Sequence, residues 1–431
     1  MKYDTISPKQ AEIFKFPHED YDALICDGAV RSGKTSMMMI AFVEWAMNRF
    51  NGCNFGICGK TVLSAERNII TPFTRIVSMA RKYKIRYRRS LMLMTVEYGD
   101  TVNYFYIFGG KDESSYALIQ GITLSGVLFD EVALMPRSFV EQGITRTLSE
   151  ENAKLWFSCN PESPNHWFYL EWIQEAARHR AKHLHFLMTD NPSLSEKSIQ
   201  RAAASFTGVF YDRYILGLWK KAQGLIYPHF DPQMHIVTTE EIPQSGQYYI
   251  SVDYGTSNPF SAGLWMVLHG VAYRIKEYYF DSRKEGYQKT DEQYADEIYK
   301  QLAVGYPIKH IILDPSAASF KVCLRRRGWV IRDADNDVIP GIMNTASALQ
   351  YGRIKIHESC KDLIRELGLY SWDEKATEDK PKKENDHACD DMRYLVRTVL
   401  RRDVDYFDKA IQWDIEDGQD NIIIDGKRLY R

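Results

Sequence analysis

The sequence lacks any run of about twenty apolar residues, the length that an α-helix needs to cross a bilayer. Its first segment, MKYDTISPKQ, lacks the apolar core of a secretion signal. We therefore expect neither a membrane span nor a cleaved leader. Charge of one sign is also missing, because the formal net charge is only −2. Any surface that binds nucleic acid must then be a local one.

Cysteine is scarce, and the seven cysteines include no C-x-x-C pair. This pattern disfavours a structural zinc site and indicates reduced thiols in a cytosol. What the chain does contain is ordinary for a globular protein, with 45% hydrophobic and 26% charged residues. A length of 431 residues exceeds one ordinary core and predicts two domains.

Residues 24–35, LICDGAVRSGKT, contain the strongest motif in the sequence. The pattern G-x-x-x-x-G-K-[ST] is the phosphate-binding loop, or Walker A motif. Its glycines let the backbone turn tightly and direct N–H groups at phosphate oxygens, while the following helix points its N-terminus at them. Lys34 is expected to reach the β- and γ-phosphates, and the Thr35 hydroxyl to bind Mg²⁺. The loop residues predicted to bind ATP are Gly28, Arg31, Ser32, Gly33, Lys34 and Thr35.

Residues 125–131, SGVLFDE, read as a buried strand that ends in two acids. In a phosphate-loop fold, an acid at such a strand end holds Mg²⁺, which is the role we expect for Asp130. The adjacent Glu131 is placed to polarise the water that attacks the γ-phosphate. The pair favours ATP hydrolysis over simple nucleotide binding. Strands separated by helical segments predict an α/β fold, with a parallel sheet covered by helices on both faces.

Three further residues in the first half of the sequence each have two possible roles. Gln10, just upstream of the loop, either hydrogen-bonds an adenine edge or is an exposed helix residue. Arg31 either reaches the γ-phosphate as an arginine finger in cis or faces solvent. Asn160 is the last residue of the strand predicted at 154–160, and it either senses the γ-phosphate or belongs to a turn before Pro161.

The second half places acids at two strand ends and on a late helix. Asp253 ends the strand 247–253, Asp314 ends the strand 308–314, and a helix at 386–400 carries His387 and Asp390 at i, i+3. Clustered carboxylates are what hard divalent cations require, and phosphodiester cleavage benefits from two ions about 3.5–4 Å apart. The order of strands, hairpin and helices is that of a ribonuclease-H-like fold. Asp386 and Asp391 compete with Asp390 for the third ligand position.

Taken in order, these motifs resemble the large terminase subunit of tailed bacteriophages. Gln10, GAVRSGKT at 28–35, GVLFDE at 126–131 and SCN at 158–160 are similar to its ATPase half, and VDYG at 252–255, LDPS at 313–316 and DHACDDMRY at 386–394 to its nuclease half. The resemblance implies an ASCE-type ATPase domain at 1–219, a linker at 220–246, a nuclease domain at 247–402 and an acidic tail at 403–431. It favours the functional readings of Arg31 and Asn160.

By the same resemblance Asp253, Asp314 and Asp390 are metal ligands and His387 is an auxiliary residue near them. Many family members have a small residue where this chain has Asp391. The implied cofactors are ATP with Mg²⁺ and two Mg²⁺ or Mn²⁺ ions. The implied partners are double-stranded DNA, the portal protein, the small terminase subunit and further copies in a ring, in the host cytoplasm. The alternative is a translocase whose ribonuclease-H-like half only binds DNA.

Basic residues near these acids are candidate phosphate contacts. Arg325–Arg327 follow the Asp314 strand, and Lys380, Lys382 and Lys383 precede the Asp390 helix. The six positive charges of residues 81–89 are read as a solvated face.

Overall fold

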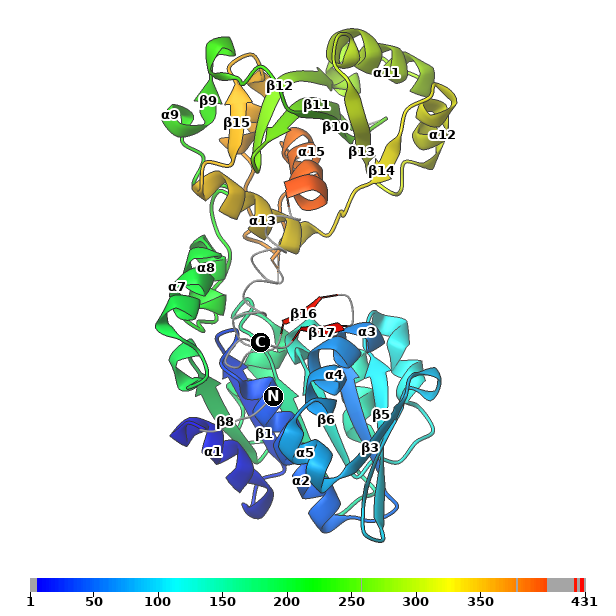
Figure 1. Ribbon diagram of the computed structural model, residues 1–431, viewed down its shortest axis with the longest axis vertical. Coiled ribbons are helices and arrows are strands. Elements are labelled where there is room, and N and C mark those ends of the chain that lie inside the picture. The colour runs from blue at the N-terminus through cyan, green and yellow to red at the C-terminus, as the bar shows by residue number, and fades with distance from the viewer. Residues whose placement is uncertain (1–5, 257, 377–378, 401–421, 425–426, 430–431) are drawn as a thin grey trace. The chain divides into compact units, whose positions relative to one another are not determined.

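The computed structural model describes residues 6–256, 258–376, 379–400, 422–424 and 427–429. The chain divides into two compact units, Met1–Ala222 and Gln223–Arg431. Figure 1 shows one sheet with flanking helices in each unit. Among the described residues, none of the helices is both long and apolar enough to cross a membrane.

The first unit is built on a sheet in the order β3-β4-β5-β2-β6-β7-β1-β8. Its strands are β1 Ala23–Gly28, β2 Asn54–Gly59, β3 Lys84–Arg88, β4 Leu93–Tyr98, β5 Thr101–Gly109, β6 Gly126–Asp130, β7 Lys154–Ser158 and β8 Ala181–Phe186. From β5 to β8 all pairs are parallel, as the sequence predicts, whereas β3 and β4 extend the sheet in antiparallel fashion.

Helices cover both faces of this sheet, with α2 Lys34–Arg49 in the core on one face and α6 Arg137–Thr145 in the core on the other. The other helices of the first unit are α1 Pro8–Lys15, α3 Val62–Ala65, α4 Thr71–Thr74, α5 Val77–Lys82, α7 Glu196–Ala204 and α8 Gly208–Tyr214. Successive residues of β1 alternate between two cores: Leu24 packs in the core around α2, and Ile25 in the core around α6. This two-sided burial explains the continuous apolar run of the strand.

Strand β7 lies between β1, which precedes the Walker loop, and β6, which ends in Asp130. An added strand at this place defines the ASCE type of ATPase fold and confirms the fold predicted for the first half. All three strands are parallel, so the Walker loop, Asp130 and Asn160 meet at one edge of the sheet.

The second unit has a sheet in the order β14-β13-β10-β11-β12-β15-β9. Its strands are β9 Ile236–Val237, β10 Gln247–Asp253, β11 Phe260–Leu268, β12 Val271–Phe280, β13 Ile308–Leu313, β14 Ile331–Asp333 and β15 Ile354–His357. An antiparallel meander β10-β11-β12 is extended on the β10 side by the parallel strands β13 and β14. This is the ribonuclease-H-like arrangement that the sequence predicts.

The helices of the second unit place its carboxylates. They are α9 Pro232–His235, α10 Ser282–Glu285, α11 Asp291–Glu297, α12 Ala318–Arg326, α13 Val338–Gln350, α14 Lys361–Leu367 and α15 His387–Leu395, which continues as a π-helical turn Val396–Leu400. Helix α15 packs across β10 and β11 (Figure 1). The side chains of α15 therefore lie beside the end of β10.

The segments predicted as a linker and as an acidic tail are described in part. The linker predicted at 220–246 is ordered against the second unit, where Ile236–Val237 pairs with β15 and Ile226 N–H donates to the Tyr370 carbonyl. The tail at 403–431 lies outside the described residues, except that Ile422–Ile424 (β16) and Lys427–Leu429 (β17) form an antiparallel pair. The basic stretch 81–89 supplies the edge strand β3.

Candidate active sites

The Walker loop has a backbone that only glycine can supply at its start. Gly28 has a φ of +120°, and a Cβ atom there would lie 2.0 Å from the Phe186 carbonyl oxygen. Gly33 has a φ of +82° and immediately precedes helix α2. The predicted turn between a buried strand and a helix N-terminus is therefore present, which is the arrangement that binds phosphate.

Lys34 is buried at the first position of α2. Its ammonium group donates to Asn160 Oδ1 at 2.7 Å and to the Ala29 carbonyl at 3.1 Å. Burial lowers the pKa of Lys34, and the nearby charges of Asp130 and Asp27 oppose that effect. The structure thus brings the Walker lysine and the polar residue after β7 into direct contact.

Thr35, Asp130 and Ser158 form a second contact at the same strand ends. The Thr35 and Ser158 hydroxyls both donate to Asp130 Oδ1, at 2.8 and 2.5 Å. Burial raises the pKa of Asp130, while these hydrogen bonds lower it. A hydroxyl and a buried carboxylate oxygen side by side are hard oxygen donors that fit Mg²⁺. Ser158 belongs to the SCN segment at 158–160, and its contact with Asp130 is not among the roles that the sequence predicts.

Glu131 lies next to these groups in an unusual backbone conformation. Its φ is +57°, in the left-handed region that residues other than glycine rarely adopt. Burial and the charge of Asp130 both raise the pKa of Glu131. A raised carboxyl pKa suits a group that accepts a proton near neutral pH.

Gln10 and Arg31 differ in burial, since Gln10 is buried and Arg31 is exposed. Gln10 is only 2% exposed and donates from Nε2 to the Ser32 carbonyl at 3.2 Å, so the reading as an exposed helix residue is wrong. It also completes a capping box with Ser7 at the start of α1. Arg31 is exposed, has a φ of +57°, and its carbonyl accepts from Asn191 Nδ2 at 2.8 Å.

A buried carboxylate that the sequence does not single out lies just before the loop. Asp27 accepts from His183 Nε2 at 2.8 Å, from His185 Nδ1 at 3.0 Å and from Trp219 Nε1 at 2.7 Å. Burial alone would raise the pKa of Asp27, but these hydrogen bonds hold it well below its usual range. An acid within an apolar strand was the available signal. The contacts tie β1 to β8 and to the end of the first unit.

In the second unit, the two strand-end acids meet through a tyrosine of α15. Tyr394 Oη lies 3.4 Å from Asp253 Oδ1 and 3.2 Å from Asp314 Oδ2. Burial raises the pKa of Asp253 to about 6, opposed by a hydrogen bond from His387 and reinforced by the charge of Asp390. Hydrogen bonds from Ser316 and others lower the pKa of Asp314 despite its partial burial.

His387 and Asp390 face the same site from α15. His387 Nδ1 lies 2.8 Å from Asp253 Oδ2. Burial alone would lower the pKa of His387, but this bond and the acids around it raise it. Asp390 Oδ1 accepts from Arg393, at 3.1 Å from Nε and 3.0 Å from Nη2. The three predicted ligands thus lie around Tyr394 and Arg393, neither of which the sequence singles out.

Among the described residues, no group of three or more His, Cys, Asp or Glu side chains is arranged to hold a metal ion. The carboxylate oxygens at this site are the donors that hard cations prefer. Their present partners are protein groups, since Arg393 engages Asp390 and Tyr394 contacts the other two. The donor chemistry therefore fits divalent ions, whereas the arrangement is not that of a preformed metal centre.

The rival acids on α15 separate by position. Asp386 lines the same cavity as Asp253, His387 and Asp390. Asp391 is fully buried and faces the sheet, where it pairs with Arg274. Asp391 is therefore not in reach of a ligand in the cavity, and Asp386 is the remaining neighbour of Asp390 there.

The cavity beside these acids measures about 800 Å³. Its lining combines the acids with four basic side chains, Arg283, Lys284, Arg365 and Lys383. Of the predicted basic runs, only Lys383 lines this cavity, and Arg327 is paired with Glu292 and Asp296 of α11. A cavity lined by both basic side chains and carboxylates can hold a phosphodiester near carboxylate-bound cations.

Proteins of known structure share this fold over most of the chain. The structure of a large terminase from a thermophilic bacteriophage is 46% identical to the chain, with a TM-score of 0.86, over 92% of this chain and 100% of that one. The chain belongs to the large terminase family. A model of that family, described as terminase large subunit, T4likevirus-type, N-terminal, matches residues 25–234.

Two other comparisons agree with the terminase assignment. The same thermophilic phage terminase in complex with ATP-gamma-S is 45% identical, with a TM-score of 0.83, over 92% of this chain and 100% of that one. The large terminase subunit of Escherichia phage T5 is 25% identical over 295 residues, which are 64% of this chain and 65% of the T5 protein. The match thus spans somewhat less than two thirds of the T5 protein.

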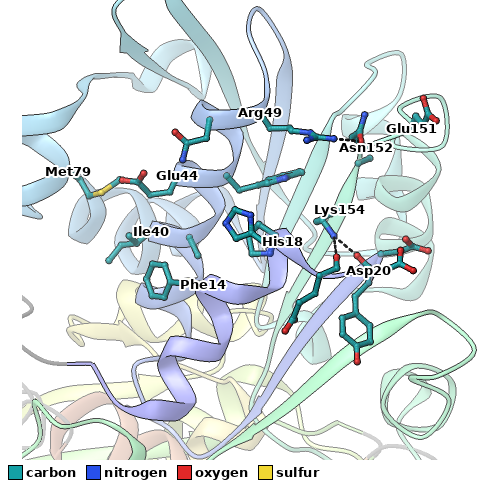
Figure 2. A pocket seen from close by; sticks show the side chains of 18 of the residues that line it. Phe14, His18, Asp20, Ile40, Glu44, Arg49, Met79, Glu151, Asn152 and Lys154 are labelled. Atoms are coloured by element: carbon teal, nitrogen blue, oxygen red, sulfur yellow. Dashed lines mark hydrogen bonds between the residues drawn. The ribbon is translucent and has the colours of Figure 1, made fainter.

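The terminase chain has another cavity, of about 1080 Å³, in the first unit. Figure 2 shows Phe14 and Ile40 on one side of it and Lys154 on the other. Its lining includes Asp20 and Asp22, which precede β1, whereas the Walker loop follows β1. The cavity therefore lies at the opposite end of the strand from the nucleotide site and takes no part in it.

Proposed function

We propose that this chain is the DNA-packaging subunit that hydrolyses ATP to move double-stranded DNA into a procapsid and cleaves that DNA with its second unit. One observation carries the proposal: a Walker site with a paired Thr35–Asp130 and a carboxylate site around Tyr394 occur in one polypeptide. The family membership and the nucleotide complexes of the thermophilic phage terminase support it.

At the ATP site each side chain has a defined task. Lys34 and the loop N–H groups bind the phosphates, and Thr35 and Asp130 hold Mg²⁺, which neutralises charge on the phosphate oxygens. Glu131 accepts the proton of the attacking water, and Arg31 contacts the γ-phosphate from the same chain. Asn160, bonded to Lys34, is placed to respond when that lysine turns to phosphate.

At the nuclease site Asp253, Asp314 and Asp390 hold two divalent ions, Mg²⁺ or Mn²⁺, whose chemistry is to activate a nucleophile and stabilise the leaving oxygen. His387 orients Asp253 through its 2.8 Å contact. Arg283, Lys284 and Lys383 bind the DNA backbone at the cavity wall. Phosphate contacts of this kind position a duplex without reading its sequence.

The partners follow from the packaging role. We propose that the protein acts in the host cytoplasm with the portal protein of the procapsid and the small terminase subunit. Several copies form a ring on the portal. The ATPase activity belongs to the Met1–Ala222 unit and the nuclease activity to the Gln223–Arg431 unit.

A second candidate function is a DNA translocase whose ribonuclease-H-like unit only grips DNA. The ion pair between Asp390 and Arg393 favours this function, because Asp390 is the third predicted metal ligand and its carboxylate is already bound to Arg393. The described residues also contain no preassembled metal group. The two candidates differ in a single respect, which is cleavage.

Plasmid nicking separates the two candidates. We expect wild-type protein with Mn²⁺ or Mg²⁺ to convert supercoiled plasmid to the open circle, and Asp253→Ala or Asp314→Ala to abolish that conversion. The unfolding transition of the second unit is the folding control for these variants, and ATP hydrolysis reports on the first unit only. If wild-type protein hydrolyses ATP but cuts with neither ion, the gripping function replaces the nuclease.

The ATPase assignment has its own test. Glu131→Ala should bind ATP with near-normal affinity and lose hydrolysis, because the phosphate contacts remain and the proton acceptor is gone. Lys34→Ala should weaken both binding and hydrolysis. Turnover by Glu131→Ala at the wild-type rate would remove Glu131 from the reaction.

A further inference from the structure

Helix α15 supplies three groups to the nuclease cavity, namely His387, Asp390 and Tyr394. Their positions relative to Asp253 and Asp314 depend on how the helix is held against the sheet. Two buried carboxylates outside the cavity hold it, one on α15 itself and one on α14.

The first carboxylate is Asp391, and it contacts three neighbouring strands. Its Oδ1 accepts from Ser251 Oγ of β10 at 2.9 Å, its Oδ2 accepts from Ser261 Oγ of β11, and Arg274 of β12 bonds both oxygens. Asp391, Arg274 and both serines are fully buried. Asp391 therefore connects the helix to every strand of the antiparallel meander.

The attachment to β10 lies next to a predicted metal ligand. Ser251 and Asp253 are two residues apart on β10, so their side chains project from the same face of the strand. Asp390 is the neighbour of Asp391 on α15. A displacement of the helix along β10 that breaks the contact with Ser251 must also change the separation of Asp390 from Asp253.

The second carboxylate is Glu366 of α14, which caps the N-terminus of α15. It accepts from the backbone N–H groups of Ala388 at 2.7 Å and Cys389 at 3.3 Å, and from Tyr279 Oη at 2.9 Å. Glu366 has no exposed surface. These contacts fix the first turn of α15, which carries His387 and Asp390.

We propose that Asp391 and Glu366 are positioning residues that set where α15 holds Asp390 and His387 opposite Asp253 and Asp314. This inference rests on the proposed nuclease function. The physical reason is that a buried ion pair such as Arg274–Asp391 adds little stability compared with apolar residues of similar size, yet it fixes a register. The role of Asp391 is thus to position the helix, which differs from the metal contact predicted for its neighbour Asp390.

The decisive variant replaces the whole ion pair, Arg274→Met with Asp391→Leu. Removing both charges avoids an uncompensated charge in the core, so the melting temperature and ATP hydrolysis should stay close to wild type. Mn²⁺ binding, followed by the electron paramagnetic resonance signal of free Mn²⁺, should weaken about 10- to 100-fold, the usual effect of losing a group that orients a ligand. Plasmid nicking should fall in parallel.

Two further variants make the test specific. Glu366→Ala removes the cap of α15 and should weaken Mn²⁺ binding in the same direction. Lys289→Met removes contacts with Glu297 and Tyr278 in the same unit without touching α15, and should leave Mn²⁺ binding and nicking unchanged. Asp253→Ala defines how much Mn²⁺ binding belongs to this site.

Different results would overturn the positioning role and the nuclease function. Wild-type protein that shows neither nicking nor Mn²⁺ binding dependent on Asp253 overturns the proposed nuclease. Wild-type protein that shows both, with a folded double variant that binds Mn²⁺ as tightly as wild type, overturns the positioning role. If the double variant does not fold, Glu366→Ala decides by the same Mn²⁺ titration.

Discussion

Two residues with predicted catalytic roles, Arg31 and Glu131, have left-handed backbone conformations with φ of +57°. Such conformations cost of order 1–3 kcal/mol for residues other than glycine and persist where neighbouring contacts enforce them. For Arg31 one such contact is the hydrogen bond from Asn191 to its carbonyl. Arg31 is exposed at this turn, directly before the Ser32-Gly33-Lys34 part of the Walker loop.

If Arg31 acts on the γ-phosphate of its own chain, a monomer is sufficient for hydrolysis. We expect dilute monomeric protein to hydrolyse ATP and Arg31→Ala to lower kcat by about 10³-fold or more, with little change in ATP affinity. Arg88→Ala, at an exposed position of β3, is the control. Steady-state kinetics across protein concentrations provide the measurement. Activity that appears only on oligomerisation would place the finger in trans.

The buried carboxyl of Glu366 should make the stability of the second unit depend on pH. Burial raises the pKa of Glu366 from 4.5 to about 6. Because the folded protein holds this proton more tightly than the unfolded chain, protonated Glu366 stabilises the fold. The contribution is complete below pH 4.5, the pKa in the unfolded chain, and is lost as the pH rises through 6. Glu366→Gln keeps an acceptor for the α15 N–H groups and cannot ionise. We expect it to be more stable than wild type by about 2 kcal/mol at pH 8, and equal to it near pH 4.

Denaturant unfolding without added metal measures this difference, with the second unit's transition followed separately from the first. A variant that is less stable than wild type at pH 8 would show that the ionised cap outweighs the cost of burying its charge.

At the scale of elements, the sequence predicts those with strong local patterns. The strands that lead into Asp130, Asp253 and Asp314 occur as expected. Strand β8 is not predicted, because His183 and His185 interrupt its alternation of apolar and polar residues. Strands β14 and β15 are not predicted, because they contain only three and four residues. Residues 84–88 form an edge strand in which exposed and half-buried residues alternate. Because its exposed side chains are basic, the sequence alone indicates only a solvated face.

The same limit applies to the sites. Motif residues are found because their chemistry requires a fixed type and spacing, as for Lys34, Thr35 and Asp130. Tyr394 meets Asp253 and Asp314 only through contacts that the fold creates, and no local pattern marks it. Arg393 lies three residues from Asp390 on α15, but an acid and an arginine at that spacing are common on helices and do not by themselves indicate a site. The burial of Asp391 likewise depends on Arg274, which lies 117 positions away in the sequence.

One inter-element contact, Asp27 to Trp219, has a measurable consequence. Val30 N–H also donates to the Tyr214 carbonyl, so the start of the Walker loop is tied twice to the segment that ends the first unit. Trp219→Phe removes the donor and keeps the ring that stacks on Tyr169. We expect a loss of about 1.5 kcal/mol in stability and a slower hydrolysis of ATP.

Hydrogen exchange of residues 214–219 with and without ATP-gamma-S is the direct measurement. Wild-type protein should show nucleotide-dependent protection there, reduced in Trp219→Phe, and Trp167→Phe serves as the control. Equal protection in wild type and Trp219→Phe would mean that the loop and this segment are not coupled through Asp27.

At the scale of the whole molecule, each unit has its own sheet and its own core. Lys34 and Thr35 bond to Asn160 and Asp130 of the first unit, whereas Asp253, Asp314 and Asp390 bond to His387, Tyr394 and Arg393 of the second. Among the described residues, each of these side-chain contacts thus lies within one unit. Sequence motifs alone predict this division, because each half contains a complete set.

This separation predicts independent chemistry in the full-length protein. Lys34→Ala should lose ATP hydrolysis and still nick plasmid with Mn²⁺ at close to the wild-type rate, since every residue around Tyr394 is unchanged. Asp314→Ala should show the converse, with full ATP turnover and no nicking. Both activities are measured on one preparation of each variant, with melting temperature as the control for folding. A tenfold or larger fall in nicking by Lys34→Ala, with nucleotide absent from the assay, would mean that the two units share a state that the Walker lysine controls, because additivity is expected only for sites without shared partners.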